Sequence, residues 1–374
     1  MSDNILVSGG VAPGFEAVKD VFAKNLADGL EVGAGFTVYR DGEPVVDLWG
    51  GHADEAKTRP WQEDTIVNLF SSTKGPMALA VAMLVDRGKL AYSDKVATHW
   101  PEFAANGKQD ITVAQLLSHQ GGVCGLREPI TVDKYEDWDF MCAQLAAMEP
   151  FWTPGDGSGY HAVTYGFLAG ELVRRIDGRT PGRFIAEEIS TPLNADFHVG
   201  LPDSVDARIA PLIAPKNTLP LAGKAPPDYV IAALANPPMK PEDANKPGWR
   251  RAEIPAANGH GTAKALARIY APLSLGGGNI IGTEALDAAT AEQCLGEDRN
   301  LGFEMSWGCG FIRNNTGIYG PNTETFGHSG WGGSLGFADR KEKLAVGYVM
   351  NQMDVNLQGD PRSMGLIGAL YQSL

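Results

Sequence analysis

The stretch from Thr65 to Val85, TIVNLFSSTKGPMALAVAMLV, decides the fold because it joins a short β-rich segment to a long apolar run. The run from Met77 to Val85 is apolar on every face of a helix, and Gly88 follows it as a stop signal. A helix without a polar face is stable only when it is buried on all sides. We therefore expect this helix at the centre of a domain.

The junction between the two halves is Ser71-Ser72-Thr73-Lys74, the one place in the chain where lysine follows serine by three residues. On a helix, this spacing puts the Lys74 amine beside Ser71 Oγ. A helix N-terminus favours a neutral lysine and a serine alkoxide, so Ser71 becomes a candidate nucleophile. The plain alternative is a serine N-cap followed by a solvated lysine. Pro76 is unexpected, because it removes a hydrogen bond if it lies in the second turn.

Composition places the chain among ordinary globular proteins. Its 374 residues are enough for two to three domain-sized units. Hydrophobic residues make up 44% of the chain and charged residues 20%, which is the usual balance of a globular protein. Lys and Arg number 31 against 45 Asp and Glu, which gives a formal charge of -14. This acidic balance opposes binding to polyanions, so we expect no nucleic-acid partner.

Targeting signals are missing from the N-terminal sequence MSDNILVS, which has an early acid and no basic region. No apolar run approaches the length of a membrane helix. We therefore expect a soluble cytoplasmic protein with no membrane partner. Cys124, Cys142, Cys294 and Cys309 are far apart in the sequence and are expected to be reduced, buried thiols.

The periodicity indicates an α+β chain. Helices are expected at 15–26, 77–85, 112–117, 165–176 and from about 362, and strands at 35–39, 45–49, 308–312, 334–338 and 344–350. Residues 213–260 are proline-rich and suggest long loops. Because strands occur at both chain ends and helices dominate the middle, we predict a sheet domain from 1–88 and 270–374 and a mainly helical insertion domain from 89–269.

Several motifs in order give the chain a family resemblance. The S-x-x-K element is followed by ITVAQLLSHQGG at 111–122, Tyr160-His161-Ala162, GTAKALAR at 261–268 and FGHSGWGG at 326–333. Together they resemble the serine β-lactamase and penicillin-binding-protein superfamily from about residue 30 to 350, and best the class C branch with its family VIII carboxylesterases. The resemblance implies a β-lactamase-like fold, with an antiparallel sheet flanked by helices and an all-α insertion.

The resemblance also implies roles for particular residues. Ser71 matches the acyl-accepting nucleophile and Lys74 its activating lysine. Tyr160 matches the tyrosine that moves protons between Ser71, the leaving group and water, with Tyr165 as the rival on spacing. The oxyanion hole is implied to be the backbone N–H groups of Ser71 and Trp331.

Two departures from the family pattern bear on the substrate. His328-Ser329-Gly330 stands where the lactamases and peptidases carry Lys-Thr-Gly, so a cation for a substrate carboxylate is missing. The element at 160–162 lacks the asparagine that contacts the antibiotic side chain in the lactamases. We expect His328, Ser329, Gly330 and Trp331 to bind substrate, with His328 as a structural neutral residue in the plainer interpretation.

Other motifs carry little weight. Gly332-Gly333-Ser334-Leu335-Gly336 matches the nucleophile elbow of α/β-hydrolases, but that elbow needs a helix after the serine and a later histidine, and Ser334 has neither. The seven histidines are scattered without metal-binding spacing, so no metal or other cofactor is expected. Gly276-Gly277-Gly278 lacks the lysine of a phosphate loop and predicts a turn.

The first functional hypothesis is therefore a serine carboxylesterase that hydrolyses small acyl esters through an acyl-enzyme on Ser71, with Lys74 and Tyr160 as its general base pair. A D-amino-acid peptidase, an amidase or a weak β-lactamase is the alternative among enzymes. A non-catalytic scaffold on the same fold is the alternative from another class, because fold does not fix function. The sequence carries no signal for an oligomeric state.

Overall fold

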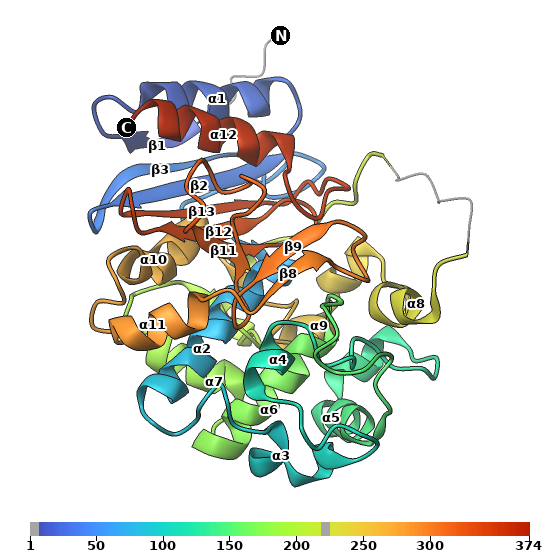
Figure 1. Ribbon diagram of the computed structural model, residues 1–374. Helices are drawn as coiled ribbons and strands as arrows, with labels where there is room; N and C mark the ends of the chain where they lie inside the picture. Colours follow the sequence, from blue (N-terminus) through green and yellow to red (C-terminus); the bar gives the residue numbers. More distant parts are fainter. Residues whose placement is uncertain (1–6, 218–224) are drawn as a thin grey trace.

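The computed structural model describes residues 7–217 and 225–374 and is built around a nine-stranded antiparallel sheet (Figure 1). The strand order is β1-β3-β2-β13-β12-β11-β10-β9-β8. The strands are β1 Val7–Val11, β2 Gly33–Arg40, β3 Glu43–Gly51, β8 Cys294–Glu297, β9 Glu304–Trp307, β10 Ile312–Arg313, β11 Phe326–Ser329, β12 Leu335–Asp339 and β13 Leu344–Met350. Strand β13 pairs with β2, so the N-terminal and C-terminal parts of the chain meet inside the sheet.

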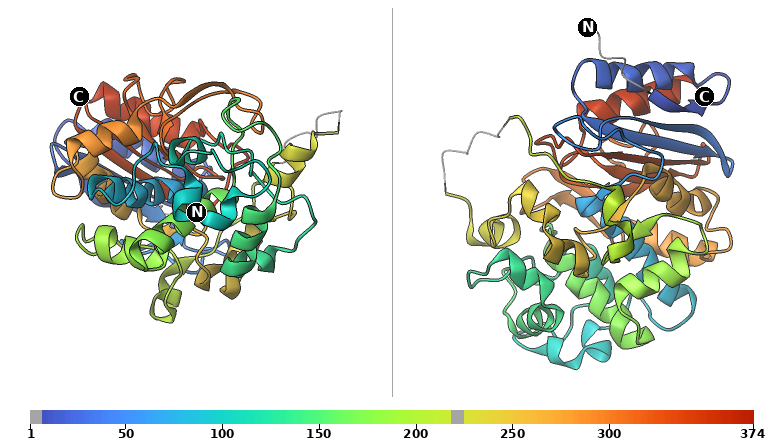
Figure 2. Two further views of the ribbon diagram at one scale, coloured as in Figure 1. Left: turned by 60° about the horizontal axis from the view of Figure 1, so that its bottom comes forward. Right: turned by 180° about the vertical axis from the view of Figure 1, so that it is seen from behind.

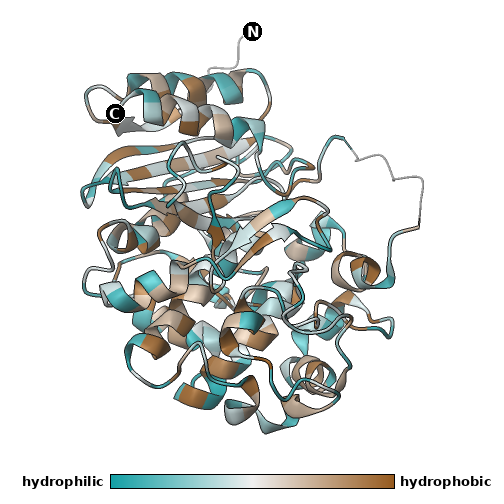
Figure 3. Ribbon diagram, viewed as in Figure 1, coloured by the Kyte–Doolittle hydropathy of each residue, from teal (hydrophilic) through white to brown (hydrophobic). Residues whose placement is uncertain are grey.

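Helices cover both faces of this sheet. The terminal helices α1 (Glu16–Ala27) and α12 (Pro361–Gln372) contact each other on one face, and α10 (Ala263–Ser274) packs on β2, β12 and β13 on the other (Figures 1 and 2). Both terminal helices carry hydrophilic as well as hydrophobic residues (Figure 3). In α1 the side chains of Val18, Phe22 and Leu26 are buried, as the helical spacing predicts.

The remaining helices lie on the side of the sheet away from α1 and α12 (Figure 1). They are α2 Lys74–Asp86, α3 Val96–His99, α4 Val113–Leu117, α5 Trp138–Ala147, α6 Thr164–Asp177, α7 Pro181–Ile185, α8 Asp228–Leu234, α9 Pro247–Arg251 and α11 Thr283–Thr290. A small second sheet has the order β5 (Phe197–His198), β7 (His260–Gly261), β4 (Ile66–Asn68), β6 (Ile209–Ala210). The division into two domains stays a prediction.

Helix α2 is the buried helix that the apolar run predicts. Every residue from Lys74 to Leu84 is buried. The helix begins at Lys74, so Pro76 lies in its first turn, where the amide groups have no intrahelical acceptor. Gly75 is required at this point, because a Cβ there would lie 1.9 Å from the Tyr270 hydroxyl.

Two sequence-based expectations need correction. The strand expected at 308–312 is wrong: β9 ends at Trp307 and β10 starts at Ile312, with a turn between them. Gly310 in that turn has a φ of +91°, and a Cβ there would collide with the Tyr165 hydroxyl. The proline-rich part is also more regular than expected, since α8, α9 and a 3₁₀ turn at Pro241–Asn245 lie within it. Residues 218–224 of that part lie outside the described residues.

Candidate active site

Ser71 lies in a 3₁₀ segment, Phe70–Thr73, that joins β4 to α2. Phe70 has a φ of +42°, a backbone conformation that is costly for a bulky residue and is found mostly at functional sites. The Phe70 ring packs against Trp331 at 5.0 Å and against Trp249 at 6.4 Å between ring centroids. This aromatic packing holds the strained turn that presents Ser71.

Lys74 is buried and has only uncharged partners. Its Nζ lies 3.0 Å from Ser71 Oγ, 2.6 Å from the Ala162 carbonyl oxygen and 3.0 Å from the Ala256 carbonyl oxygen. Burial lowers the pKa of Lys74 well below its usual range, and no carboxylate hydrogen-bonds it among the described residues. A neutral amine has two N–H groups and one lone pair. The two carbonyls take the N–H groups, which leaves the lone pair for the Ser71 hydroxyl.

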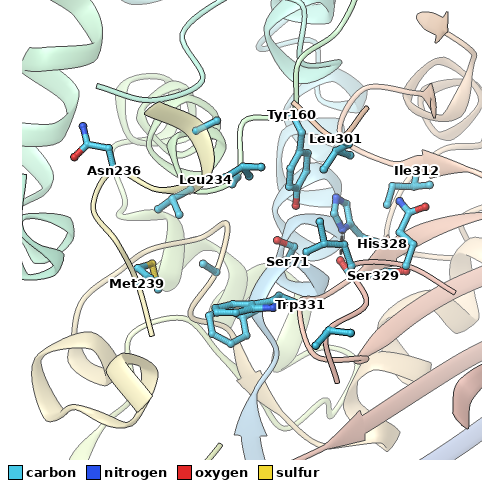
Figure 4. Close-up of a pocket in the computed structure, with 18 of the residues that line it drawn as sticks. Ser71, Tyr160, Leu234, Asn236, Met239, Leu301, Ile312, His328, Ser329 and Trp331 are labelled. Atoms are coloured by element: carbon cyan, nitrogen blue, oxygen red, sulfur yellow. Dashed lines mark hydrogen bonds between the residues drawn. The ribbon is translucent and has the colours of Figure 1, made fainter. Parts of the chain in front are cut away.

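The Tyr160 side chain points toward Ser71 (Figure 4). Lys74 Nζ is 4.8 Å from the centroid of the Tyr160 ring, and burial raises the pKa of the Tyr160 phenol. The ring stacks on Trp307 at 5.7 Å with an interplanar angle of 7°. Because its pKa is raised, Tyr160 keeps its proton at neutral pH.

The rival Tyr165 is placed differently. Its ring centroid is 5.8 Å from Lys74 Nζ, but the residue is absent from the cavity wall that Ser71 and Tyr160 share. Its buried hydroxyl has no hydrogen-bond partner among the described residues, and burial raises its pKa. The geometry therefore groups Tyr160, rather than Tyr165, with Ser71.

Two residues that sequence reasoning missed fix the backbone of Tyr160. The Tyr160 N–H donates to Asp298 Oδ1 at 2.9 Å, and Asn300 Nδ2 donates to the Tyr160 carbonyl at 2.9 Å. Asp298 also accepts a hydrogen bond from Ser158 Oγ. Asp298 and Asn300 lie about 140 positions further along the chain, and no local pattern marks them.

Three buried histidines surround the site without adding charge. Burial lowers the pKa of His161 and of His328 to about 3, and it holds that of His119 well below its usual range. His328 Nδ1 lies 2.7 Å from the Ser329 carbonyl oxygen, so Nδ1 carries the proton. His328 Nε2 is left without a partner among the described residues. A neutral His328 therefore occupies the position that is a lysine in the Lys-Thr-Gly element of the lactamases, so this position carries no positive charge.

The candidate oxyanion hole has two free amides. Within the described residues, no acceptor is found for the backbone N–H of Ser71 or of Trp331. Gly330 precedes Trp331 and is held by two contacts: its N–H donates to the Ser334 carbonyl at 2.7 Å, and its carbonyl accepts from Gly333 N–H at 3.0 Å. Unlike His328, Ser329 and Trp331, Gly330 does not line the cavity at Ser71, because it packs against Leu69 and Ser334.

The cavity that opens at Ser71 has a volume of about 270 Å³ and a mostly apolar wall (Figure 4). Leu234 and Met239 come from the α8 region, and Leu301 and Ile312 from the sheet side. No Asp, Glu, Lys or Arg is among the described residues that line it. A space of this kind suits neutral, apolar substituents.

The remaining candidates from the sequence are structural. Ser334 is fully buried, donates to the Leu69 carbonyl at 2.8 Å and lies 2.9 Å from Ser72 Oγ, so its hydroxyl is committed. Cys124, Cys142, Cys294 and Cys309 are all free. Residues 7–217 and 225–374 contain no group of three or more acidic, histidine or cysteine side chains that could hold a metal. In the same residues no helix has the length and apolarity needed to cross a membrane.

Comparison with known proteins identifies the family of this chain. The Beta-lactamase family model matches residues 18–369, so the chain belongs to that family. It is 35% identical to the esterase/beta-lactamase LipL of Mycobacterium tuberculosis, over 93% of this chain and 83% of LipL. A family VIII carboxylesterase crystal structure matches with a TM-score of 0.95 and 47% identity, covering 99% of this chain and 100% of that one. A penicillin-binding protein homologue from Caulobacter crescentus matches with a TM-score of 0.93, 47% identity and the same coverage.

Proposed function

We propose that the protein is a serine hydrolase of the esterase type, a carboxylesterase that acts on small neutral acyl esters through an acyl-enzyme on Ser71. The observation that carries this proposal is the Lys74 amine, which is buried among carbonyl groups and turned toward Ser71 Oγ at 3.0 Å. A base with a depressed pKa next to a serine hydroxyl is the arrangement that nucleophilic catalysis requires. The esterase names of LipL and of the family VIII structure support the same class.

In the acylation step, Ser71 Oγ attacks the ester carbonyl carbon and its proton passes to Lys74 Nζ. The carbonyl oxygen takes the electron pair, and the N–H groups of Ser71 and Trp331 stabilise it. When the bond to the leaving oxygen breaks, Tyr160 donates its proton to that oxygen and recovers a proton from Lys74. In deacylation, water attacks the acyl carbon and its proton passes through Tyr160 to Lys74. The bond between the acyl carbon and Ser71 Oγ then breaks, Lys74 returns a proton to Ser71 Oγ, and the carboxylic acid is released.

Substrate class follows from the wall of the cavity. A carboxylate-bearing antibiotic or peptide would have to enter a site whose described lining has no Lys or Arg and whose His328 is neutral. Desolvating that carboxylate without a partner is unfavourable. An amide nitrogen also needs a better acid than an ester oxygen does, and the raised pKa of Tyr160 makes it a weak acid. Both arguments favour a neutral ester.

Covalent labelling tests the proposal. A phosphonate with a p-nitrophenyl leaving group should add one adduct to the protein and abolish hydrolysis of p-nitrophenyl butyrate. Peptide mapping should find the adduct on Ser71, and Ser71→Ala should not be labelled. An adduct on Ser334 would contradict the choice of nucleophile. Faster turnover of a D-alanyl peptide or a cephalosporin than of the butyrate ester would contradict the substrate class.

A further inference from the structure

Arg362 is a buried residue that the proposed chemistry does not use. It lies in the first turn of α12 with only 3% of its surface exposed, and its guanidinium is fully engaged. The Nη1 donates to the Gln352 carbonyl at 2.7 Å and to Glu31 Oε2 at 3.3 Å, and Nη2 donates to Asp360 Oδ2 at 2.6 Å. These contacts connect the first turn of α12 to the segment after β13, which contains Gln352, and to the loop between α1 and β2, which contains Glu31.

One further contact of Arg362 reaches the candidate oxyanion hole. Its Nη2 donates to the Gly332 carbonyl at 2.8 Å, one residue after Trp331. Gly332 and Gly333 have φ angles of +95° and +126°, and a Cβ on Gly333 would lie 2.5 Å from Asp360 Oδ2 and 2.7 Å from Arg362 Nη2. The backbone at Gly333 therefore runs directly against this ion pair, which only glycine permits.

Two peptide planes connect Arg362 to the Trp331 amide. In a trans peptide, C=O and N–H point in opposite directions. Arg362 holds the Gly332 carbonyl on one side, so the Gly333 N–H points to the other side, where it donates to the Gly330 carbonyl at 3.0 Å. That bond fixes the Gly330 carbonyl, and the Trp331 N–H at the other end of the same peptide must point away from it.

We propose that Arg362 is a positioning residue for ester hydrolysis, which sets the direction of the Trp331 N–H through the Gly332–Gly333 and Gly330–Trp331 peptide planes. This inference rests on the proposed function, because it takes the Trp331 N–H as a donor to the oxyanion. Asp354 N–H also donates to the Gly332 carbonyl, at 3.0 Å, and remains when Arg362 is replaced. Loss of Arg362 should therefore misalign the Trp331 amide without removing it.

The test compares Arg362→Gln with the matched control Glu171→Gln. Glu171 is a buried carboxylate in α6 that accepts from Arg174, Arg175 and Trp138 and does not line the cavity. The readouts are kcat and KM for p-nitrophenyl butyrate and the inhibition constant of an alkyl trifluoromethyl ketone. When the ketone binds, Ser71 Oγ bonds to its carbonyl carbon, the carbonyl electrons move to oxygen, and the serine proton passes to Lys74.

Loss of a whole oxyanion-hole donor costs about 10²- to 10³-fold in kcat, so misalignment in Arg362→Gln should cost about 10-fold, with a similar weakening of the ketone. KM should change less than about twofold, because ground-state binding uses the apolar cavity. Glu171→Gln should lower the melting temperature while leaving kcat and the ketone affinity unchanged. Arg362→Lys, which restores one donor, should recover part of the loss.

A folded Arg362→Gln enzyme with unchanged ketone affinity would overturn the inference, and so would an equal loss in Glu171→Gln. If Arg362→Gln does not fold, Asp360→Asn is the second variant. It keeps the α12 N-cap and the Arg362 guanidinium but removes the ion pair that holds the guanidinium in place. It should lower kcat and ketone affinity together, and unchanged values would again overturn the inference. Failure of the proposed function is a different result: the wild-type enzyme would neither hydrolyse the butyrate ester nor bind the ketone at Ser71.

Discussion

Replacing Lys74 by methionine should lower kcat for p-nitrophenyl butyrate by about 10³-fold, because general-base catalysis contributes about 10²- to 10⁴-fold and no other group can take over. Among the described residues, Lys74 Nζ is the only basic nitrogen that hydrogen-bonds Ser71. Tyr160 has a raised pKa and keeps its proton, and burial lowers the pKa of His161 and of His328 to about 3, so both are weak bases. A factor of 10³ corresponds to about 4 kcal/mol of transition-state stabilisation.

Methionine matches the length of the lysine stem but leaves the carbonyls of Ala162 and Ala256 without their donor. An unsatisfied buried carbonyl costs about 1–3 kcal/mol, and removal of a buried amine offsets part of this cost. Thermal unfolding must therefore show that Lys74→Met is folded at the assay temperature. Lys74→Arg is the matched control, because its guanidinium stays charged and should be equally inactive.

The pH dependence of kcat/KM should report the protonation state of Lys74. Burial lowers the pKa of Lys74, so the amine is neutral above its folded pKa and protonated below it. Activity that requires the neutral amine is present above that pKa and is lost as the pH falls through it. The acidic limb of the kcat/KM profile should thus disappear in Lys74→Met.

The double variant Lys74→Met/Tyr160→Phe should lose little beyond either single variant, since residues that act as a unit are not additive. A Lys74→Met enzyme that keeps more than about a tenth of the wild-type kcat would refute the reasoning, given the expected size of general-base effects. Independent losses that multiply to about 10⁶-fold in the double variant would refute the shared relay.

Three further outcomes are expected. His328→Lys should raise the ratio of kcat/KM for a carboxylate-bearing cephalosporin to kcat/KM for p-nitrophenyl butyrate by about 10-fold, because it supplies the missing cation. An unchanged ratio would mean that another residue, for example Ala162, sets the preference for esters over cephalosporins. Ser334→Ala should reduce the free energy of unfolding by about 1 kcal/mol, since the Leu69 carbonyl loses the Ser334 hydroxyl and keeps only the Ser72 N–H as donor, while mass spectrometry still finds the phosphonate on Ser71. Burial raises the pKa of Cys124 and of Cys309 to about 12, so a thiol reagent such as DTNB should react with these two cysteines only after unfolding, and rapid reaction in the native protein would contradict their burial.

The parts of the site that the sequence predicts are those encoded locally. The apolar run predicts α2, and the three-residue spacing predicts that Lys74 meets Ser71, because both depend on helix geometry alone. Thr112 and Gln115 form the N-terminal cap that the threonine signal indicates. Contacts between distant segments have no such signature. Nothing near Arg362 in the sequence shows that it donates to Gly332, 30 positions away.

Short segments explain the errors in the secondary structure. The residues from 308 to 312 include two glycines, and in the structure they turn between β9 and β10 so that Gly310 can approach Tyr165. In the proline-rich part, α9 begins at Pro247, whose fixed φ suits a first helical position. A helix of five residues is too short to show a periodic pattern in the sequence. Pro247 is therefore interpreted from the sequence as a loop residue, whereas in the structure it is the first residue of α9.

The neutral cavity and the neutral base depend on each other. A nearby anion favours the protonated form of an amine, so a carboxylate bound beside Ser71 would raise the pKa of Lys74 and convert the base to an ammonium group. The lining described for the cavity has no carboxylate, and the partners of Lys74 are carbonyl and hydroxyl oxygens. A neutral ester leaves this balance undisturbed, whereas an anionic substrate both lacks a cation at His328 and inactivates the base. The uncharged wall thus keeps the Lys74 amine deprotonated, and the same wall supports our proposal that the substrate is a neutral ester.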